Sequence, residues 1–145
     1  MAKAKGSNLC PICQTPIQLG DIKPLRKSED ILPYLDHFRD KKQEFFICFS
    51  LDSGRRLIAR RVVTIGLLDA TLAHPREVFA GPLVDRAAAI IVAHNHPSGE
   101  ASPSKHDIEM TQQLIAAGQL LGVPLQDHLI ITAKNHYSFK QNSLI

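Results

Sequence analysis

The sequence predicts an α/β or α+β fold built on a mixed central sheet, and three observations lead to this class. Strand-like and helix-like stretches alternate along the chain. Residues 87–93 form an uninterrupted apolar run, which is typical of a central strand buried on both faces. Residues 104–121 have the pattern of one long amphipathic helix. With 145 residues, 44% of them hydrophobic, the chain has room for one domain with a core and a short appendage.

The first 30 residues differ from the rest and are predicted to form a flexible or metal-clipped appendage, so the main domain would span residues 31–145. This segment holds three prolines, polar spacers and little periodicity. It also holds the pair Cys10 and Cys13, half of the ligand set of a structural zinc site. Because the sequence has no second pair, sharing across a dimer, redox chemistry and coincidence all stay open.

The first half of the main domain is predicted to contain a short helix and a hairpin. A three-residue apolar step favours a helix over 31–38. The aromatic-rich run 45–51 reads as a buried strand, and the turn residues 52–54 would connect it to a partner strand at 56–63. Residues 64–71 are expected to form a further strand or a connecting loop.

The second half is predicted to complete the sheet and cover it with helices. Pro75 opens a helical stretch, at a position where its missing N–H costs nothing. Residues 81–82 (Gly-Pro) should kink or break that helix, because the proline ring clashes with the carbonyl four residues back. The helix 104–121 should stop at the glycine that follows it, and 125–132 and 137–139 are expected to be closing strands.

The charge pattern permits nucleic-acid contact without requiring it. The net charge is +3, and arginines gather at Arg55, Arg56, Arg60 and Arg61. A solvated strand edge explains this group more simply than a nucleic-acid surface does, so the two arginines at 60–61 are expected to face water in part. The chain has no Trp, and its other aromatic residues are not interleaved with basic ones. Nucleic acid is therefore a partner that the sequence allows but does not support.

The sequence predicts a cytoplasmic protein. No run approaches the roughly 20 apolar residues of a membrane span, and no apolar stretch follows the basic N-terminus as in a signal peptide. Three cysteines, an odd number, do not indicate a disulfide scaffold. The sequence gives no indication of the oligomeric state.

The strongest chemical signal lies where the predicted central strand ends and the long helix begins. His94 and His96 are two residues apart, so on an extended backbone their side chains point the same way. Asp107 lies in the first turn of the following helix, and the intervening loop is long enough to fold that turn back over the strand end. Two histidines and one carboxylate leave a coordination position open, which is the pattern of a catalytic zinc site.

Each part of this pattern also has a purely structural explanation. A buried histidine is usually a satisfied core residue, and Ser104-x-x-Asp107 at a helix start is usually a capping box. The joint spacing favours a metal site, since the strand has no other reason to end in two histidines.

Two segments resemble a known metalloprotease signature. His94-Asn95-His96-Pro97-Ser98-Gly99, followed by Ser104-Lys105-His106-Asp107, is similar to the JAMM (MPN+) signature of His-x-His, seven residues and Ser-x-x-Asp, with a glutamate upstream. The residues of the motif are most similar to the RadC-like branch of this family. Residues 74–77, 117–122 and 127–131 also resemble that branch, in the same order along the chain. The resemblance covers about residues 40–145. It implies an MPN/JAB-like central mixed sheet flanked by helices.

The resemblance also implies residue roles. The segment around Glu44 matches the part of the family that carries the upstream glutamate, so Glu44 would be the general base. Glu77 is the competitor, but an acidic residue at a helix start is favoured by the dipole anyway. Ser104 would stabilise the oxyanion, and His94, His96 and Asp107 would hold Zn²⁺. The implied activity is hydrolysis of an amide, peptide or isopeptide, in a peptide or protein substrate.

Two other classes of metal-dependent enzyme fit the sequence less well. Zinc deaminases need His-x-Glu followed by a Pro-Cys-x-x-Cys motif, an order this sequence lacks, and a metal-dependent barrel would need about 250 residues. A non-catalytic or DNA-associated RadC-like module, serving DNA repair or mobile elements, is the second hypothesis. Asp127 and His128 are expected to lie in the sheet near the site without ligating, and Cys48 to be inert core. His74, His106 and His136 are expected to be surface or turn residues.

Overall fold

The domain is built on one mixed five-stranded sheet. The structure is a computed structural model and describes residues 23–66 and 73–145. In space the strands follow the order β2-β1-β3-β4-β5. β1 is antiparallel to β2 and β3, β3 is parallel to β4, and β4 is antiparallel to β5. The predicted mixed α/β architecture is confirmed. The strand bounds are β1 Glu44–Leu51, β2 Leu57–Gly66, β3 Ala89–Asn95, β4 Leu125–Ile131 and β5 His136–Ser138.

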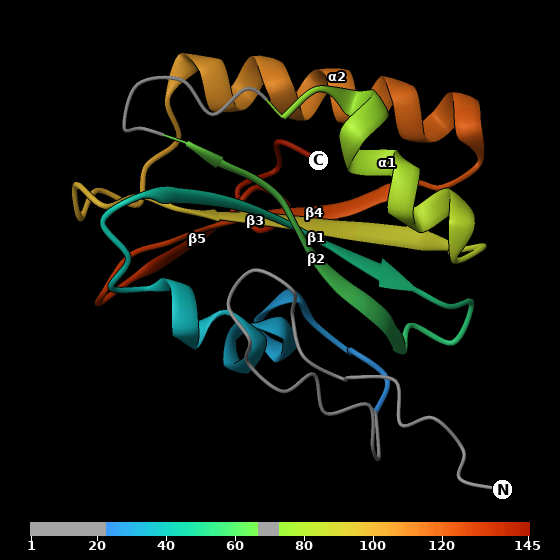
Figure 1. Ribbon diagram of the computed structural model, residues 1–145, viewed down its shortest axis with the longest axis horizontal. Helices are drawn as coiled ribbons and strands as arrows, with labels where there is room; N and C mark the ends of the chain where they lie inside the picture. Colours follow the sequence, from blue (N-terminus) through green and yellow to red (C-terminus); the bar gives the residue numbers. More distant parts are fainter. Residues whose placement is uncertain (1–22, 67–72) are drawn as a thin grey trace, which may run out of the picture.

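Helices cover both faces of this sheet (Figure 1). The two α-helices, α1 (Pro75–Val84) and α2 (Lys105–Leu121), lie on one face, and two 3₁₀ helices, η1 (Ser28–Tyr34) and η2 (Asp36–Phe38), lie on the other. The helix predicted at 31–38 is therefore present as two short 3₁₀ segments. Pro33 inside η1 has no N–H to donate, and such short, tight turns are the usual form of 3₁₀ structure.

The alternation of side chains along the strands separates two apolar cores. From β1, Phe45, Ile47 and Phe49 point to the 3₁₀ side, where they pack with Leu35 and Phe38. The other set packs on the α-helical side and combines strand residues with residues from both helices: Phe46, Cys48, Ile90, Val92, Val78, Phe79, Met110 and Leu114. β3 is buried along its whole length, as its apolar run predicted.

Helix α1 corrects one expectation, because it runs through Gly81 and Pro82 without the predicted break and ends at Val84. Pro82 removes one backbone hydrogen bond, the one that an N–H there would donate to Val78 O, and the last turn still closes through Asp85 N–H to Gly81 O (2.9 Å). A Cβ at Gly81 would lie 2.7 Å from the Arg61 side chain, so a larger residue there would force that side chain to move.

Helix α2 begins and ends as predicted. Ser104 is its N-cap, and Asp107 completes a capping box with it. Gly122 ends the helix in the left-handed conformation, with φ of 72°.

The solvated strand edge expected around residues 55–61 is present except at Arg60: Arg55 and Arg56 are exposed and Arg61 is partly exposed. Arg60 is only 9% exposed: its guanidinium lies 5.6 Å from the Phe38 ring centroid and donates to Tyr34 O. Arg61 points to the opposite face and pairs with Asp85. Neighbouring strand residues face opposite ways, so the sheet divides the pair instead of presenting one basic surface.

Several sequence predictions fall on residues outside the described ranges. Cys10 and Cys13 are among these residues, so the appendage predicted at 1–30 stays a prediction. Leu25 is buried in the core and its N–H donates to Arg55 O, so packing with the domain begins before residue 31. Within 23–66 and 73–145, no helix is long and apolar enough to cross a membrane.

Candidate metal centre

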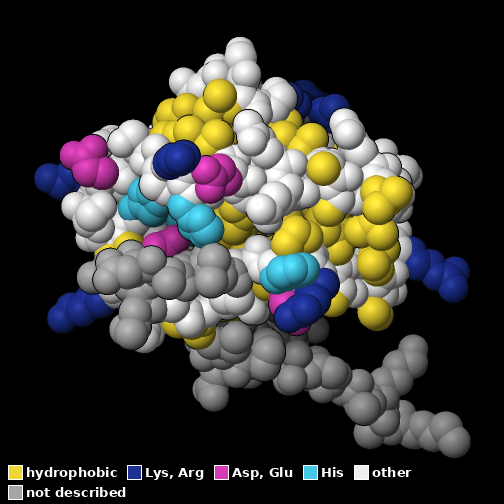
Figure 2. Space-filling model, turned by 90° about the horizontal axis from the view of Figure 1, so that it is seen from above, with side chains coloured by type: hydrophobic (Ala, Val, Ile, Leu, Met, Phe, Trp, Pro, Cys, Tyr) yellow, Lys and Arg dark blue, Asp and Glu magenta, His cyan; other side chains and the backbone are white. Residues whose placement is uncertain are grey.

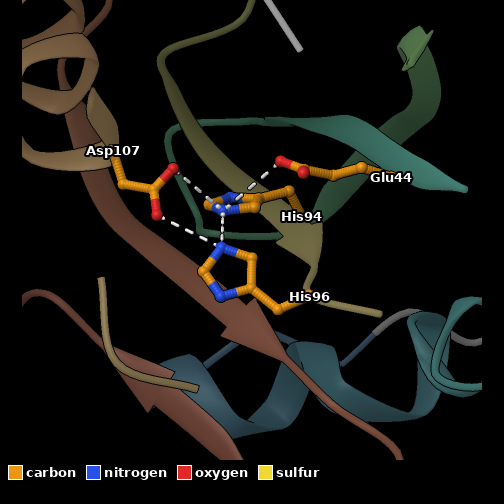
Figure 3. A group of neighbouring side chains, drawn as sticks. All are labelled: Glu44, His94, His96 and Asp107. Carbon is orange, nitrogen blue, oxygen red and sulfur yellow. Dashed lines mark hydrogen bonds and ion pairs between the residues drawn. The ribbon is translucent and has the colours of Figure 1, made fainter. Parts of the chain in front are cut away.

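The two histidines of the motif converge at the carboxyl end of β3 (Figure 3). Their Nε2 atoms lie 2.8 Å apart, as their two-residue spacing predicted. His94 is fully buried, and His96, just past the strand, is partly accessible. The carboxyl end of a strand is the usual place for a site in an α/β sheet.

Asp107 brings a carboxylate to both histidines from the first turn of α2. Its Oδ1 lies 3.2 Å from His94 Nε2, and its Oδ2 lies 3.2 Å from His96 Nε2. The capping box fixes this carboxylate, because the Ser104 N–H donates to Oδ2 at 2.9 Å while Ser104 Oγ accepts from the Asp107 N–H at 3.1 Å. The cap and the ligand geometry are therefore one arrangement, not competing explanations of the motif.

Glu44, the first residue of β1, completes the group. Its Oε1 lies 3.8 Å from His94 Nε2. One ligand atom from each of the four residues Glu44, His94, His96 and Asp107 lies within 4.8 Å of the others. Burial raises the pKa of the Glu44 carboxyl above its ordinary value. Glu44 is thus the most distant member of the group and the one that holds a proton most readily among its carboxylates.

The donor set fits a divalent cation. The His96 Nδ1 atom donates to the Glu100 carbonyl at 2.7 Å, so the lone pair of a neutral His96 is on Nε2 and faces the group. Around a four-coordinate zinc with bonds of about 2.0–2.1 Å, ligand atoms are roughly 3.3 Å apart. The separations of 2.8, 3.2 and 3.2 Å among His94, His96 and Asp107 are close to this value. Imidazole and carboxylate are also the ligand types that zinc accepts.

The protonation preferences of the group agree with a cation site. Burial opposes ionisation of Asp107, yet its interactions with the His94 and His96 rings and with the Ser104 backbone hold the pKa of its carboxyl far below the ordinary value. Burial likewise opposes a charged His96, but the Asp107 carboxylate and the Glu100 carbonyl raise the pKa of its ring. The arrangement therefore favours positive charge at the point where the four side chains meet.

Asn95, between the two histidines, is a residue that the sequence analysis missed. Its side chain is fully buried and points to the opposite face of the sheet. Oδ1 accepts from the Phe45 N–H at 2.7 Å, and Nδ2 donates to Gln43 O at 2.9 Å. These contacts hold the backbone on both sides of Glu44. The signal that would have found it is a polar residue at the end of a buried strand, on the face opposite to the two histidines.

The other polar residues considered from the sequence lie outside the group of four. Glu77 is exposed in the first turn of α1, 3.6 Å from Arg76, and outside the group of four. His106 is exposed. Asp127 accepts from Ser138 Oγ and from the Lys140 N–H, so its carboxylate fastens the C-terminal turn. His128 does contact the site, with its Nε2 2.8 Å from His94 Nδ1.

A pocket of about 1010 Å³ opens beside the group. Its lining includes Glu44, His96, Asp107 and Ser104, together with the segment 39–42. On the helix-covered face, histidine and acidic side chains lie together at one end and again nearer the middle, and basic side chains occupy separate places within the face and at its rim (Figure 2). The site is thus accessible, and this face presents no continuous basic surface.

The comparison with protein families agrees with this geometry. The family model described as RadC-like JAB domain matches residues 25–144. The chain belongs to the RadC-like JAB family. Its mixed sheet, with helices on both faces, is consistent with the JAB/MPN-like fold.

Relatives in this family carry the name UPF0758 protein. One from Methanosarcina acetivorans is 35% identical over the whole of this chain and 66% of its own length. One from Trichormus variabilis is 43% identical over 90% of this chain and 51% of its own length. One from Methanospirillum hungatei is 53% identical over 63% of this chain and 41% of its own length. The chain therefore spans about half the length of the relatives it matches.

Proposed function

We propose that this RadC-like domain is a zinc-dependent hydrolase that cleaves amide bonds, peptide or isopeptide, with water activated at the group of four. The observation that carries the proposal is the convergence of His94, His96, Asp107 and Glu44 beside an open pocket. In this reading the first three residues hold the cation. A zinc ion bound there would supply a Lewis acid, which makes water acidic enough to attack an amide near neutral pH.

Glu44 has the properties of the general base. At 3.8 Å from His94 Nε2 it lies farther from that nitrogen than His96 or Asp107 does, which leaves room for a reacting water. Its raised pKa, caused by burial, brings its proton affinity closer to that required near neutral pH. Glu44 would accept a proton as the water oxygen attacks the carbonyl carbon, then deliver it to the departing amine nitrogen. The products are one carboxyl and one amine group for each water consumed.

Ser104 can combine two roles. Its oxygen accepts from the Asp107 N–H at 3.1 Å, so the hydroxyl proton stays available for another acceptor. The residue lines the pocket beside His96. From there the hydroxyl would donate to the carbonyl oxygen of the substrate as negative charge develops on it.

The proposed substrate is a peptide or protein. A pocket of about 1010 Å³ is large enough for several residues of extended chain, and it runs from segment 39–42 to the start of α2. Cytoplasmic residence is also part of the proposal and agrees with the free, buried thiol of Cys48.

A matched pair of glutamate variants tests the assignment. The zinc-loaded parent, Glu44→Gln and Glu77→Gln would be compared on a panel of fluorogenic peptides and isopeptide-linked conjugates, with zinc content measured in parallel. We expect E44Q to keep its zinc and lose about 10²–10⁴-fold in kcat, and E77Q to match the parent. Activity retained in E44Q, or a zinc-loaded parent that cleaves no member of the panel, would contradict the proposal.

The DNA-associated, non-catalytic alternative makes a different prediction. It requires a basic surface, but Arg60 and Arg61 point to opposite faces of the sheet and each is engaged within the domain. Filter binding to duplex DNA across a salt series would test it. Tight binding with a steep salt dependence, by a zinc-loaded protein without hydrolytic activity, would favour the alternative.

A further inference from the structure

A buried histidine on β4 connects two of the candidate ligands. His128 is fully buried, and its ring is stacked on Phe139, with centroids 4.6 Å apart and an interplanar angle of 8°. On one side its Nε2 lies 2.8 Å from His94 Nδ1. On the other side its Nδ1 lies 2.6 Å from Thr111 Oγ, on α2. Both ring nitrogens are therefore engaged with side chains at the site.

The position of each proton in this series of hydrogen bonds follows from its end at the backbone of Asp107. The Thr111 hydroxyl lies 2.6 Å from the carbonyl oxygen of Asp107, which can only accept, so the single hydroxyl proton is donated there. Thr111 Oγ must then accept from His128, which places a proton on His128 Nδ1. A second proton on this ring would be a buried charge with no carboxylate in contact, which is costly. His128 Nε2 is therefore an acceptor.

The same logic fixes His94. Because His128 Nε2 accepts, His94 Nδ1 carries the proton and donates across the 2.8 Å contact. His94 Nε2 then keeps its lone pair, and this is the atom 2.8 Å from His96 Nε2 and 3.2 Å from Asp107 Oδ1. Partners behind a metal-ligating histidine commonly fix its tautomer in this way.

We propose that Thr111 and His128 are positioning residues that hold His94 in the tautomer able to bind the metal. The chain starts at the backbone of Asp107 and ends at the ring of His94, so it also ties the ligand from α2 to the ligand from β3. The inference depends on the group of four binding a cation. It does not depend on which reaction the domain catalyses.

The ring tautomers are read directly by long-range ¹H–¹⁵N NMR of the histidines in the zinc-free protein. We expect the parent to show His94 and His128 as Nδ1–H tautomers. A parent spectrum with the proton of His94 on Nε2 would overturn the proposal whatever the variants do.

A pair of substitutions at 111 supplies the second readout, the zinc Kd measured by competition with a chelator. Thr111→Val keeps the shape and removes the hydroxyl, so we expect zinc binding to weaken about 10–100-fold. Thr111→Ser restores the hydroxyl and should bind zinc close to the parent level. Thr132→Val is the matched control, since it removes another buried hydroxyl, one that contacts Asn135 and not the site.

A merely structural role for Thr111 predicts other results. T111V and T132V would then lose similar stability in thermal melts while both keep the zinc Kd of the parent, and this outcome would overturn the proposal. If T111V does not fold, the spectra and Kd of the parent and T111S still decide, since a shifted His94 tautomer in either contradicts it. Hydrolysis is not measured, so failure here is distinct from failure of the proposed reaction.

Discussion

The two faces of the sheet use buried polar groups in opposite ways at the end of β3. On the 3₁₀ side, Asn95 is satisfied: its Oδ1 accepts from Phe45 N–H, and its Nδ2 donates to Gln43 O and Lys41 O. On the α-helical side, His94, His96 and Asp107 meet with acceptor atoms facing one another at 2.8–3.2 Å. A set of acceptors with too few protons is a place where a cation can bind, whereas a satisfied set needs no further partner.

Substitutions on the two faces should therefore change different properties of the protein. Phe38 and Asn95 lie on the face that fixes the backbone, and the histidines lie on the face where we propose that a cation binds. Changes in the apolar packing of the first face, as at Phe38, should appear in the free energy of unfolding. Changes on the second should appear in metal content and rate.

The largest expected effect is loss of the metal. His96→Ala removes a ligand from a partly accessible position, so zinc content should fall from one ion per chain to none, as measured by mass spectrometry of the dialysed protein. The zinc-free melting temperature should change little, because this side chain is not part of the apolar cores. Stoichiometric zinc in H96A would contradict the proposal that His96 is a zinc ligand.

The next largest effect belongs to the 3₁₀ side. Phe38 is fully buried against Phe45, so Phe38→Ala should lower the free energy of unfolding by about 3–5 kcal/mol in urea titrations. The folded fraction should keep the zinc Kd of the parent. Leu83→Ala, at an exposed position of α1, is the control and should cost far less. A lost zinc site in F38A would mean that the two faces are coupled.

Asn95 lies between these extremes. Asn95→Ala frees the backbone around Glu44, so it should lower kcat about 10- to 100-fold while zinc stays bound, because a small displacement of a reacting group is costly. Steady-state kinetics with parallel zinc analysis would measure both. Equal loss of zinc and activity would show instead that Asn95 acts through the histidines on either side of it.

The smallest effect concerns the ion pair between β2 and the end of α1. Hydrogen bonds from Arg61 lower the pKa of Asp85, so the pair stabilises the folded state above the unfolded pKa near 3.8, and this contribution is lost as pH falls through the folded value. Asp85→Asn should therefore cost about 1 kcal/mol at pH 7, since Arg61 is partly exposed.

Urea titrations of D85N at several pH values would show this cost shrinking toward acid. Glu77→Gln removes a largely exposed pair with Arg76 and should cost little at any pH. A cost that does not vary with pH would assign the effect to packing around Asp85 instead.

The proposed ligands were predictable because they are separated by few residues in the sequence. His94, His96 and the capping box at Ser104 depend on strand alternation and on helix-start chemistry, which are local. Glu44 was reached only through resemblance, because its place beside His94 depends on the pairing of β1 with β3, in which Phe46 lies opposite His94. The H96A and E44Q variants test the roles expected for these residues.

What the sequence did not indicate depends on contacts between distant segments. The link from Thr111 to His128 and His94 requires the parallel register of β3 and β4, in which His94 pairs with Ile130. Arg60 was expected at a solvated edge, but the 3₁₀ helices bring Phe38 beneath it. Gly81 and Pro82 were expected to kink or break α1, yet the helix continues through them to Val84.

The zinc stoichiometry of the whole chain tests the central idea most directly. Cys10→Ser and Cys13→Ser would be introduced first, so that the cysteine pair cannot contribute an ion. After zinc loading and dialysis, we predict one zinc per chain in this background and in the same background with E44Q, and none when H96A is added. A zinc-free parent background, or full occupancy with H96A, would contradict the account.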